Sequence, residues 1–242
     1  MLTFEGHHFG TGSFLSRSLS INDDKFFPVT HLDHPTIQNH DELIKTVEKE
    51  LQKGSYLSVW IEPIRQKLMD FVPHHFLLEL RKLCTKYKTS LVFNETCSSF
   101  YRYDENEFFA SNIKMITPDC TMTYLGGQAG QVFIRENLFL SNPLMLISTW
   151  DGDEFAFSNF YRAARNISEN NIKFHFTKEA FDKKLTHEIQ MYQYEEIHLK
   201  NGIGWFTGVF PHTFAKQFQN INGRYLVNPT FSMMKRYLKE GS

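Results

Sequence analysis

The sequence predicts an α/β fold in which a mostly parallel sheet is flanked by helices and followed by a small C-terminal α+β domain. Two short β-prone runs, 55–61 (SYLSVWI) and 90–93 (SLVF), enclose a segment with apolar residues at helical spacing behind Pro73. A strand–helix–strand unit of this kind places both strands parallel, with their carboxyl ends at one edge of the sheet. Glu62 and Asn94 follow the two strands, so we expect both side chains at that edge.

Composition excludes several classes of protein. The chain has 242 residues, of which 41% are hydrophobic and 22% charged, and this balance predicts a globular domain rather than a disordered chain. The net charge of −1 provides no long-range attraction for a polyanion, so we expect no nucleic-acid partner. No apolar run approaches the roughly 20 residues of a membrane span, and the three cysteines share no CxxC spacing. We therefore expect a soluble cytoplasmic protein that does not contact a membrane.

The remaining elements follow in chain order. Asn39 with Glu42 predicts a capped helix that runs through Lys53 and ends at Gly54. Later elements are expected as strands at 131–134, 145–149, 203–210 and 224–227, and as helices at 153–167, 177–190 and 232–239. The polar stretch 168–171 separates the two parts, so we expect one domain at 1–167 and a second at 168–242.

Several motifs together resemble a known enzyme family. The phrase WIEPI at 60–64 is followed by NETCSSFYR at 94–102, which is similar to the family's Asp-Glu-Val-Gln-Thr-Gly-Phe-Gly-Arg motif. Further matches, in the same order as in the family, are FEGHHFG at 4–10, Pro118-Asp119 with Gly126-Gly127, TWDGD at 149–153, GIGW at 202–205 and the segment ending at Pro229. The chain thus resembles class III aminotransferases, which use pyridoxal phosphate on the type I fold. The resemblance implies a three-layer but incomplete large domain at 1–167.

The resemblance also implies where a cofactor would lie. His8 corresponds to the ring that stacks on the cofactor, Cys97 to a glutamine near its phenolic oxygen, and Thr149 to a threonine that reaches the phosphate in the neighbouring subunit. Asn94 takes the place of the aspartate that holds a proton on the pyridine nitrogen, which a neutral amide cannot do. Glu62, at the end of the neighbouring strand, is the remaining residue that we expect at the cofactor.

The lysine that would carry the cofactor has no counterpart. The chain has no lysine between Lys114 and Lys173, and Tyr124 or Leu125 occupies the family's lysine position. Neither side chain forms a Schiff base. We therefore predict no catalytic residue, no cofactor or only weakly bound pyridoxal phosphate, and no transaminase activity of the isolated chain.

The resemblance begins at the first residues, so we expect the family's preceding sheet elements and phosphate-binding turn to be missing. The apolar surface of such a sheet must be covered by another chain or by another part of a longer protein. We expect the protein to act as a homodimer or with a complementing subunit. A pyridoxal phosphate transferase completed by a partner, with Lys114 as the amine, remains an alternative. Another is a non-catalytic binder of an amino acid or a pyridoxal vitamer that uses Glu62, Asn94, Tyr124 and Thr149.

Three local features have two readings each. The group His31, Asp33, His34 and His40 fits no common zinc spacing, so we expect a solvated loop and no metal site. Cys97 is expected to be a packed thiol, or a reactive one if Arg102 lowers its pKa. By default we expect core packing, with an exposed docking surface as the alternative, for the side chains of Phe155, Phe157, Phe160, Phe206 and Phe210.

Overall fold

The computed structural model describes residues 1–9, 28–124, 130–139 and 154–239. The expected strand–helix–strand unit is confirmed as β3 (Ser58–Ile61), α2 (His74–Lys86) and β6 (Ser90–Asn94). The two strands pair in parallel, from Ser58 opposite Ser90 to Ile61 opposite Phe93. Their carboxyl ends therefore share one edge, as expected.

The larger sheet has six strands in the order β2-β1-β3-β6-β7-β8. The additional strands are β1 (Leu2–Phe4), β2 (Thr30–Leu32), β7 (Cys120–Tyr124) and β8 (Gly130–Ile134). All neighbours pair in parallel except β7 and β8, which are antiparallel. Within the described residues, β8 is an edge strand of this sheet.

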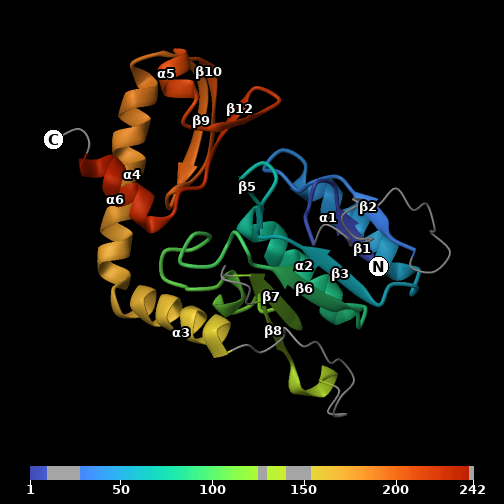
Figure 1. Ribbon diagram of the computed structural model, residues 1–242. Coiled ribbons are helices and arrows are strands. Elements are labelled where there is room, and N and C mark those ends of the chain that lie inside the picture. The colour runs from blue at the N-terminus through green and yellow to red at the C-terminus, as the bar shows by residue number, and fades with distance from the viewer. Residues whose placement is uncertain (10–27, 125–129, 140–153, 240–242) are drawn as a thin grey trace.

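Helix α1 (His40–Gln52) lies beside α2, and both pack against the sheet (Figure 1). One hydrophobic core joins Val47 of α1 and Leu80 of α2 to Ile61 and Phe93 of the strands. The short strands β4 (Ile64–Arg65) and β5 (Asp70–Phe71) form a hairpin, and the 3-10 turns are η2 (Ala110–Asn112) and η3 (Glu136–Leu138).

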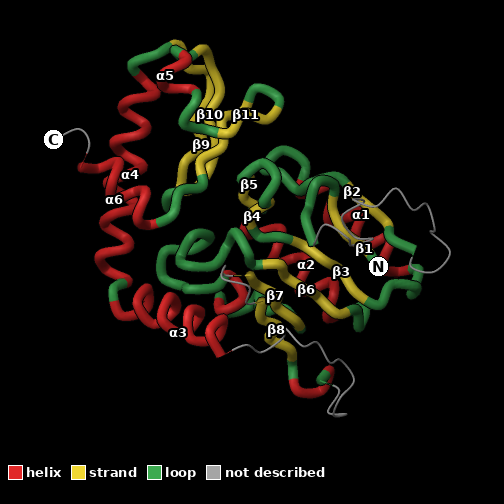
Figure 2. Tube along the Cα trace, in the orientation of Figure 1, coloured by secondary structure: helices red, strands yellow, loops and turns green. Residues whose placement is uncertain are grey.

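The C-terminal part begins with two consecutive helices, α3 (Glu154–Glu169) and α4 (Asn171–Gln190). A four-stranded antiparallel sheet follows, in the order β11-β12-β10-β9 (Figure 2). Its elements are β9 (Gln193–Lys200), β10 (Ile203–Val209), α5 (His212–Ala215), β11 (Gln219–Ile221), β12 (Arg224–Val227) and α6 (Phe231–Lys239). Helices α4 and α6 enclose an aromatic core with this sheet.

Polar contacts join the two parts. The buried Lys178 of α4 donates from Nζ to the Tyr101 carbonyl oxygen at 2.6 Å, and burial lowers the pKa of its amine to about 8. Arg102 donates to the Pro229 carbonyl oxygen at 2.8 Å, and Arg224 of β12 pairs with Asp70 at 3.0 Å. The loop after β6 is therefore fixed against the C-terminal part.

The predicted fold class is confirmed: a mostly parallel sheet flanked by helices, with a small second sheet that is antiparallel. Two local expectations were wrong. Asn39 is the N-cap residue of α1, but its side chain makes no capping hydrogen bond, because it instead accepts from the Thr36 N–H at 2.7 Å and donates to the His34 carbonyl at 2.9 Å. Helix α4 begins at Asn171 instead of residue 177, because the interruption after α3 is a single non-helical residue, Asn170.

The strand expected at 145–149 falls outside the described residues, and the domain boundary predicted after residue 167 falls near the end of α3. In the described part of the chain, no helix combines the length and hydropathy needed to cross a bilayer.

Candidate functional site

A cavity of about 380 Å³ opens where β6 and β7 end. It is lined by His8, Phe9, Gln66, Asn94, Thr96, Met122, Thr123, Tyr124, Gly130, Gln131 and Val132. The parallel strands bring together three residues that the sequence analysis singled out: His8 after β1, Asn94 at the end of β6 and Tyr124 at the end of β7. The predicted meeting of strand ends therefore forms a real hollow.

Asn94 links two walls of this cavity. Its Nδ2 donates to the His8 carbonyl oxygen at 2.6 Å, and its Oδ1 accepts from the Thr96 backbone N–H at 3.1 Å and the Thr96 hydroxyl at 2.8 Å. A protonated pyridine nitrogen would need an acceptor oxygen, and the only side-chain oxygen of Asn94 already has two donors. The side chain therefore holds the loop after β1 against β6.

Glu62 lies behind the cavity wall. Its Oε2 accepts the His8 N–H at 2.8 Å and the Gln66 N–H at 3.4 Å, while Oε1 is buried and has no hydrogen-bond partner among the described residues. Burial raises the pKa of this carboxyl from 4.5 to about 8, against the weaker opposing effect of these hydrogen bonds. Burial therefore favours the neutral carboxylic acid form of Glu62 at neutral pH.

Two buried histidines continue this neutral group. His7 Nδ1 accepts the Glu62 backbone N–H at 2.9 Å, so the ring proton lies on Nε2 and is donated to His34 Nδ1 at 3.0 Å. Burial lowers the pKa of His7 well below its usual value and lowers that of His34 to about 3. The 3.8 Å approach of His7 Nδ1 to Glu62 Oε2 is thus a contact between neutral groups.

The position of His34 corrects the sequence analysis. The expected solvated loop is wrong at this residue, because β2 pairs with β1 and so carries His34 beneath the loop that holds His7. Within the ranges that the structure describes, no three or more His, Cys, Asp or Glu side chains are grouped so that they could hold a metal ion.

The other singled-out residues lie outside the cavity or outside the description. Cys97 is buried in the core, where loss of solvent raises the pKa of its thiol to about 12, so a reactive thiol is not favoured. Arg102 turns instead to Asn228 and Pro229. Lys114 is exposed and does not line the cavity. Leu125 and Thr149 lie outside the described residues.

The described lining of the cavity lacks the groups that hold pyridoxal phosphate covalently. Its described lining contains amides, hydroxyls, one imidazole and one phenol, but no lysine, arginine, aspartate or glutamate. It therefore offers no amine for a Schiff base, no cation for a phosphate and no carboxylate for the pyridine nitrogen. The described residues do not fit a covalently held pyridoxal phosphate.

Solved structures with the same architecture are enzymes of amino-group transfer, although no protein-family model matches the sequence. Ornithine aminotransferase from Toxoplasma gondii superposes with a TM-score of 0.74 at 15% identity, over 98% of this chain and 63% of that one. An (S)-enantioselective omega-transaminase from Thermomicrobium roseum gives 0.74 at 13%, over 98% and 65%. N-acetylornithine aminotransferase from Stenotrophomonas maltophilia gives 0.66 at 17%, over 99% and 62%.

This chain has the aminotransferase fold. The expectation drawn from the resemblance to class III aminotransferases is thereby confirmed for the fold. The chain spans less than two thirds of the length of these three proteins. The Toxoplasma protein was solved with partial occupancy of pyridoxal phosphate at its active site.

Several residues of the site were not predicted from the sequence. Gln66, Thr96 and Gln131 line the cavity, and His7 and His34 buttress it. Thr96 had a detectable signal, since a threonine two residues after a strand-end asparagine is placed to bond its side chain. Gln131 reaches the cavity because β8 pairs antiparallel with β7. No local pattern in the sequence predicts this pairing.

The raised pKa of Glu62 predicts how stability depends on pH. The folded protein retains on Glu62 a proton that the unfolded chain releases near pH 4.5. The contribution of this proton to the free energy of unfolding is complete below pH 4.5 and is lost as pH rises through about 8. His34 and His7 act in the opposite direction, but only below about pH 6.5. Between pH 6.5 and 8, we expect the free energy of unfolding to fall by up to about 1.4 kcal/mol per pH unit.

Urea unfolding of the Glu62→Gln variant over this interval should give a smaller slope than the unsubstituted protein, because the amide does not titrate. The exposed Glu42→Gln variant on α1 is the matched control and should keep the slope of the unsubstituted protein. An equal slope in Glu62→Gln would show that Glu62 is ionised in the folded state.

Proposed function

We propose that this protein is a non-catalytic member of the aminotransferase fold, without transaminase activity of its own, that acts through association with a second copy of itself. The observation that carries the proposal is helix α3, none of whose described side chains is buried. An isolated helix of about 16 residues is marginal in water unless an apolar face is covered. A second chain packed against α3 would bury the apolar face that the described residues leave exposed.

The exposed face of α3 is apolar. Phe157, Phe160, Tyr161 and Ala164 recur at helical spacing, and Phe157 and Tyr161 are 52% and 62% exposed. Phe155 is 74% exposed, so the default expectation of core packing is wrong for it and for Phe157, whereas Phe206 is buried as expected. The helix lies at the margin of the molecule (Figure 1).

Strand β8 supports the same conclusion. Val132, Phe133 and Ile134 are all exposed on this edge strand, and Phe139 just beyond it is 64% exposed. An edge strand with apolar side chains and no charged residue from 130 to 134 is a site where another chain adds. We call the exposed side chains of α3 and β8 together the association face.

The cavity supports the loss of transamination. In the resemblance, a lysine would occupy the position of Tyr124 or Leu125 and an aspartate that of Asn94. Tyr124 has a phenol in place of an amine, and the side-chain oxygen of Asn94 accepts two hydrogen bonds from Thr96. Such a cavity still suits a second candidate function, the binding of a pyridoxal vitamer or an amino acid without turnover, since amides and hydroxyls line a space of 380 Å³.

The association face predicts the oligomeric state. Sedimentation velocity of the full chain should show concentration-dependent dimers, and Phe157→Glu combined with Tyr161→Glu should give monomers, because two carboxylates would be desolvated in the interface. Met191→Glu, 62% exposed at the far end of α4, is the matched control and should remain dimeric. A monomeric unsubstituted protein at every concentration would contradict association with itself.

Loss of the Schiff base predicts the outcome of chemical trapping. After addition of pyridoxal phosphate and reduction with borohydride, mass spectrometry should find no lysine labelled stoichiometrically, because no amine lines the described cavity. Stoichiometric labelling of one lysine, such as Lys114, would instead support a transferase. Saturable binding of pyridoxal without labelling would support the vitamer-binding alternative.

A further inference from the structure

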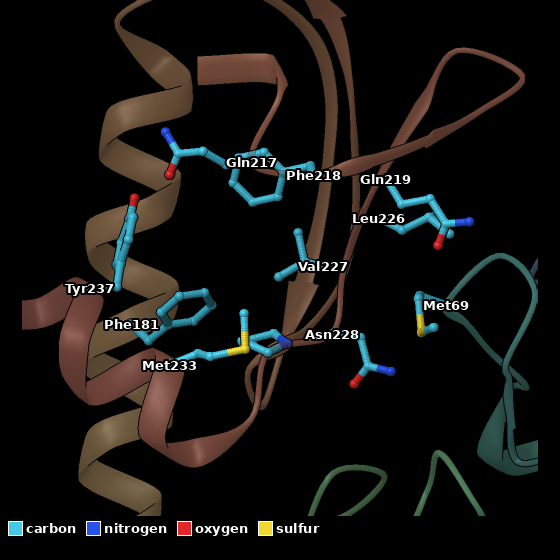
Figure 3. Close-up of a pocket in the computed structure, with 11 residues that line it drawn as sticks. Met69, Phe181, Gln217, Phe218, Gln219, Leu226, Val227, Asn228, Met233 and Tyr237 are labelled. Atoms are coloured by element: carbon cyan, nitrogen blue, oxygen red, sulfur yellow. The ribbon is translucent and has the colours of Figure 1, made fainter. Parts of the chain in front are cut away.

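A second cavity lies in the C-terminal part, apart from the one at Asn94. Its volume is about 390 Å³, and it shares no lining residue with the first cavity. It sits where β11 begins and β12 ends, between helices α4 and α6 and the turn joining β4 to β5 (Figure 3). We call it the amide-rimmed bowl, after the side chains that surround its opening.

The floor of the bowl is apolar and the rim is neutral but polar. Phe181 of α4 and Leu226 and Val227 of β12 are buried at its base. The exposed amides of Gln217 and Asn228 lie at its opening. No charged side chain occurs among its lining residues. An ionised ligand group entering the bowl would lose hydration without a compensating partner.

The bowl is held in shape by contacts outside it. Arg102 bonds the Asn228 side chain and, at 2.8 Å, the Pro229 carbonyl oxygen, which fixes one side of the rim. On the opposite side, Tyr237 donates its hydroxyl to Glu188, and Lys184 donates to the Tyr237 carbonyl oxygen at 2.7 Å. A site already ordered before binding avoids much of the entropy loss that weakens association.

Two methionines face each other across the opening. Met233 comes from α6 and is 55% exposed, whereas Met69 comes from the turn between β4 and β5 and is buried (Figure 3). Flexible thioether side chains adapt to apolar ligands of different outline. The ligand in this position would touch both parts of the fold at once.

We propose that the amide-rimmed bowl binds an uncharged small molecule with an aromatic or branched aliphatic body and one or two hydrogen-bonding groups. The body would lie on Phe181, Leu226 and Val227. Its polar groups would reach Gln217 Oε1 and Asn228 Nδ2, because Gln217 Nε2 donates to the Thr213 carbonyl oxygen and Asn228 Oδ1 accepts from Arg102. The volume lies within the range of small-molecule sites, which combine a mostly apolar lining with a few polar groups. This proposal is independent of the association face and of the cavity at Asn94.

The test uses N-phenyl-1-naphthylamine, a neutral probe that fluoresces in apolar surroundings, with the full chain. We expect saturable binding of one probe per chain. The Met233→Glu variant should bind roughly tenfold more weakly or worse, because it places a carboxylate at the opening. Met191→Glu makes the same change at an exposed methionine outside the bowl and should bind as the unsubstituted chain does.

The second readout locates the probe. With 13C-methyl methionine, the signals of Met69 and Met233 should shift together on titration, while those of Met115 and Met191 should not. Equal affinity of the two glutamate variants, unsaturable fluorescence, or shifts that exclude Met69 would each overturn the proposal. The NMR result remains decisive if Met233→Glu proves unstable, because it uses the unsubstituted chain.

Discussion

The hydrogen bond from Asn94 Nδ2 to the His8 carbonyl oxygen, 2.6 Å long, is the contact on which the candidate site depends. It joins residues separated by 86 positions and closes the loop after β1 over the end of β6. The amide oxygen of Asn94 accepts two hydrogen bonds from Thr96. At this strand end, where the resemblance places an aspartate that binds a cofactor, the chain has an amide that binds the chain itself.

A buried neutral network supports that loop from below. The Glu62 carboxyl group accepts the His8 backbone N–H, and the Glu62 backbone N–H donates to the His7 ring. The His7 ring in turn donates a hydrogen bond to His34. All three side chains are buried and uncharged near neutral pH, because desolvation opposes both a carboxylate and an imidazolium. The site is therefore built from neutral groups, which is consistent with a structural role and poorly suited to holding an anionic cofactor.

Much of the fold could be predicted, because its signals are local. The helical spacing of Phe76, Leu80 and Cys84 between two β-prone runs was sufficient for α2 and for the parallel pairing of β3 with β6. Strand β9 was missed because its sequence QYEEIHLK is mostly polar and its side chains are largely exposed. Contacts that depend on tertiary packing leave no pattern in the sequence. The hydrogen bond between His7 and His34 is an example, because it forms only when β2 pairs with β1.

The central claim, that Asn94 serves the fold instead of a cofactor, can be tested at the amide itself. The side-chain 15N–1H₂ signal of Asn94 should be followed by NMR while pyridoxal phosphate is added to the full chain. We expect unchanged chemical shifts and slow exchange of the hydrogen-bonded amide proton with solvent. A saturable shift of this signal, with loss of that protection, would instead show that Asn94 releases His8 to bind the cofactor.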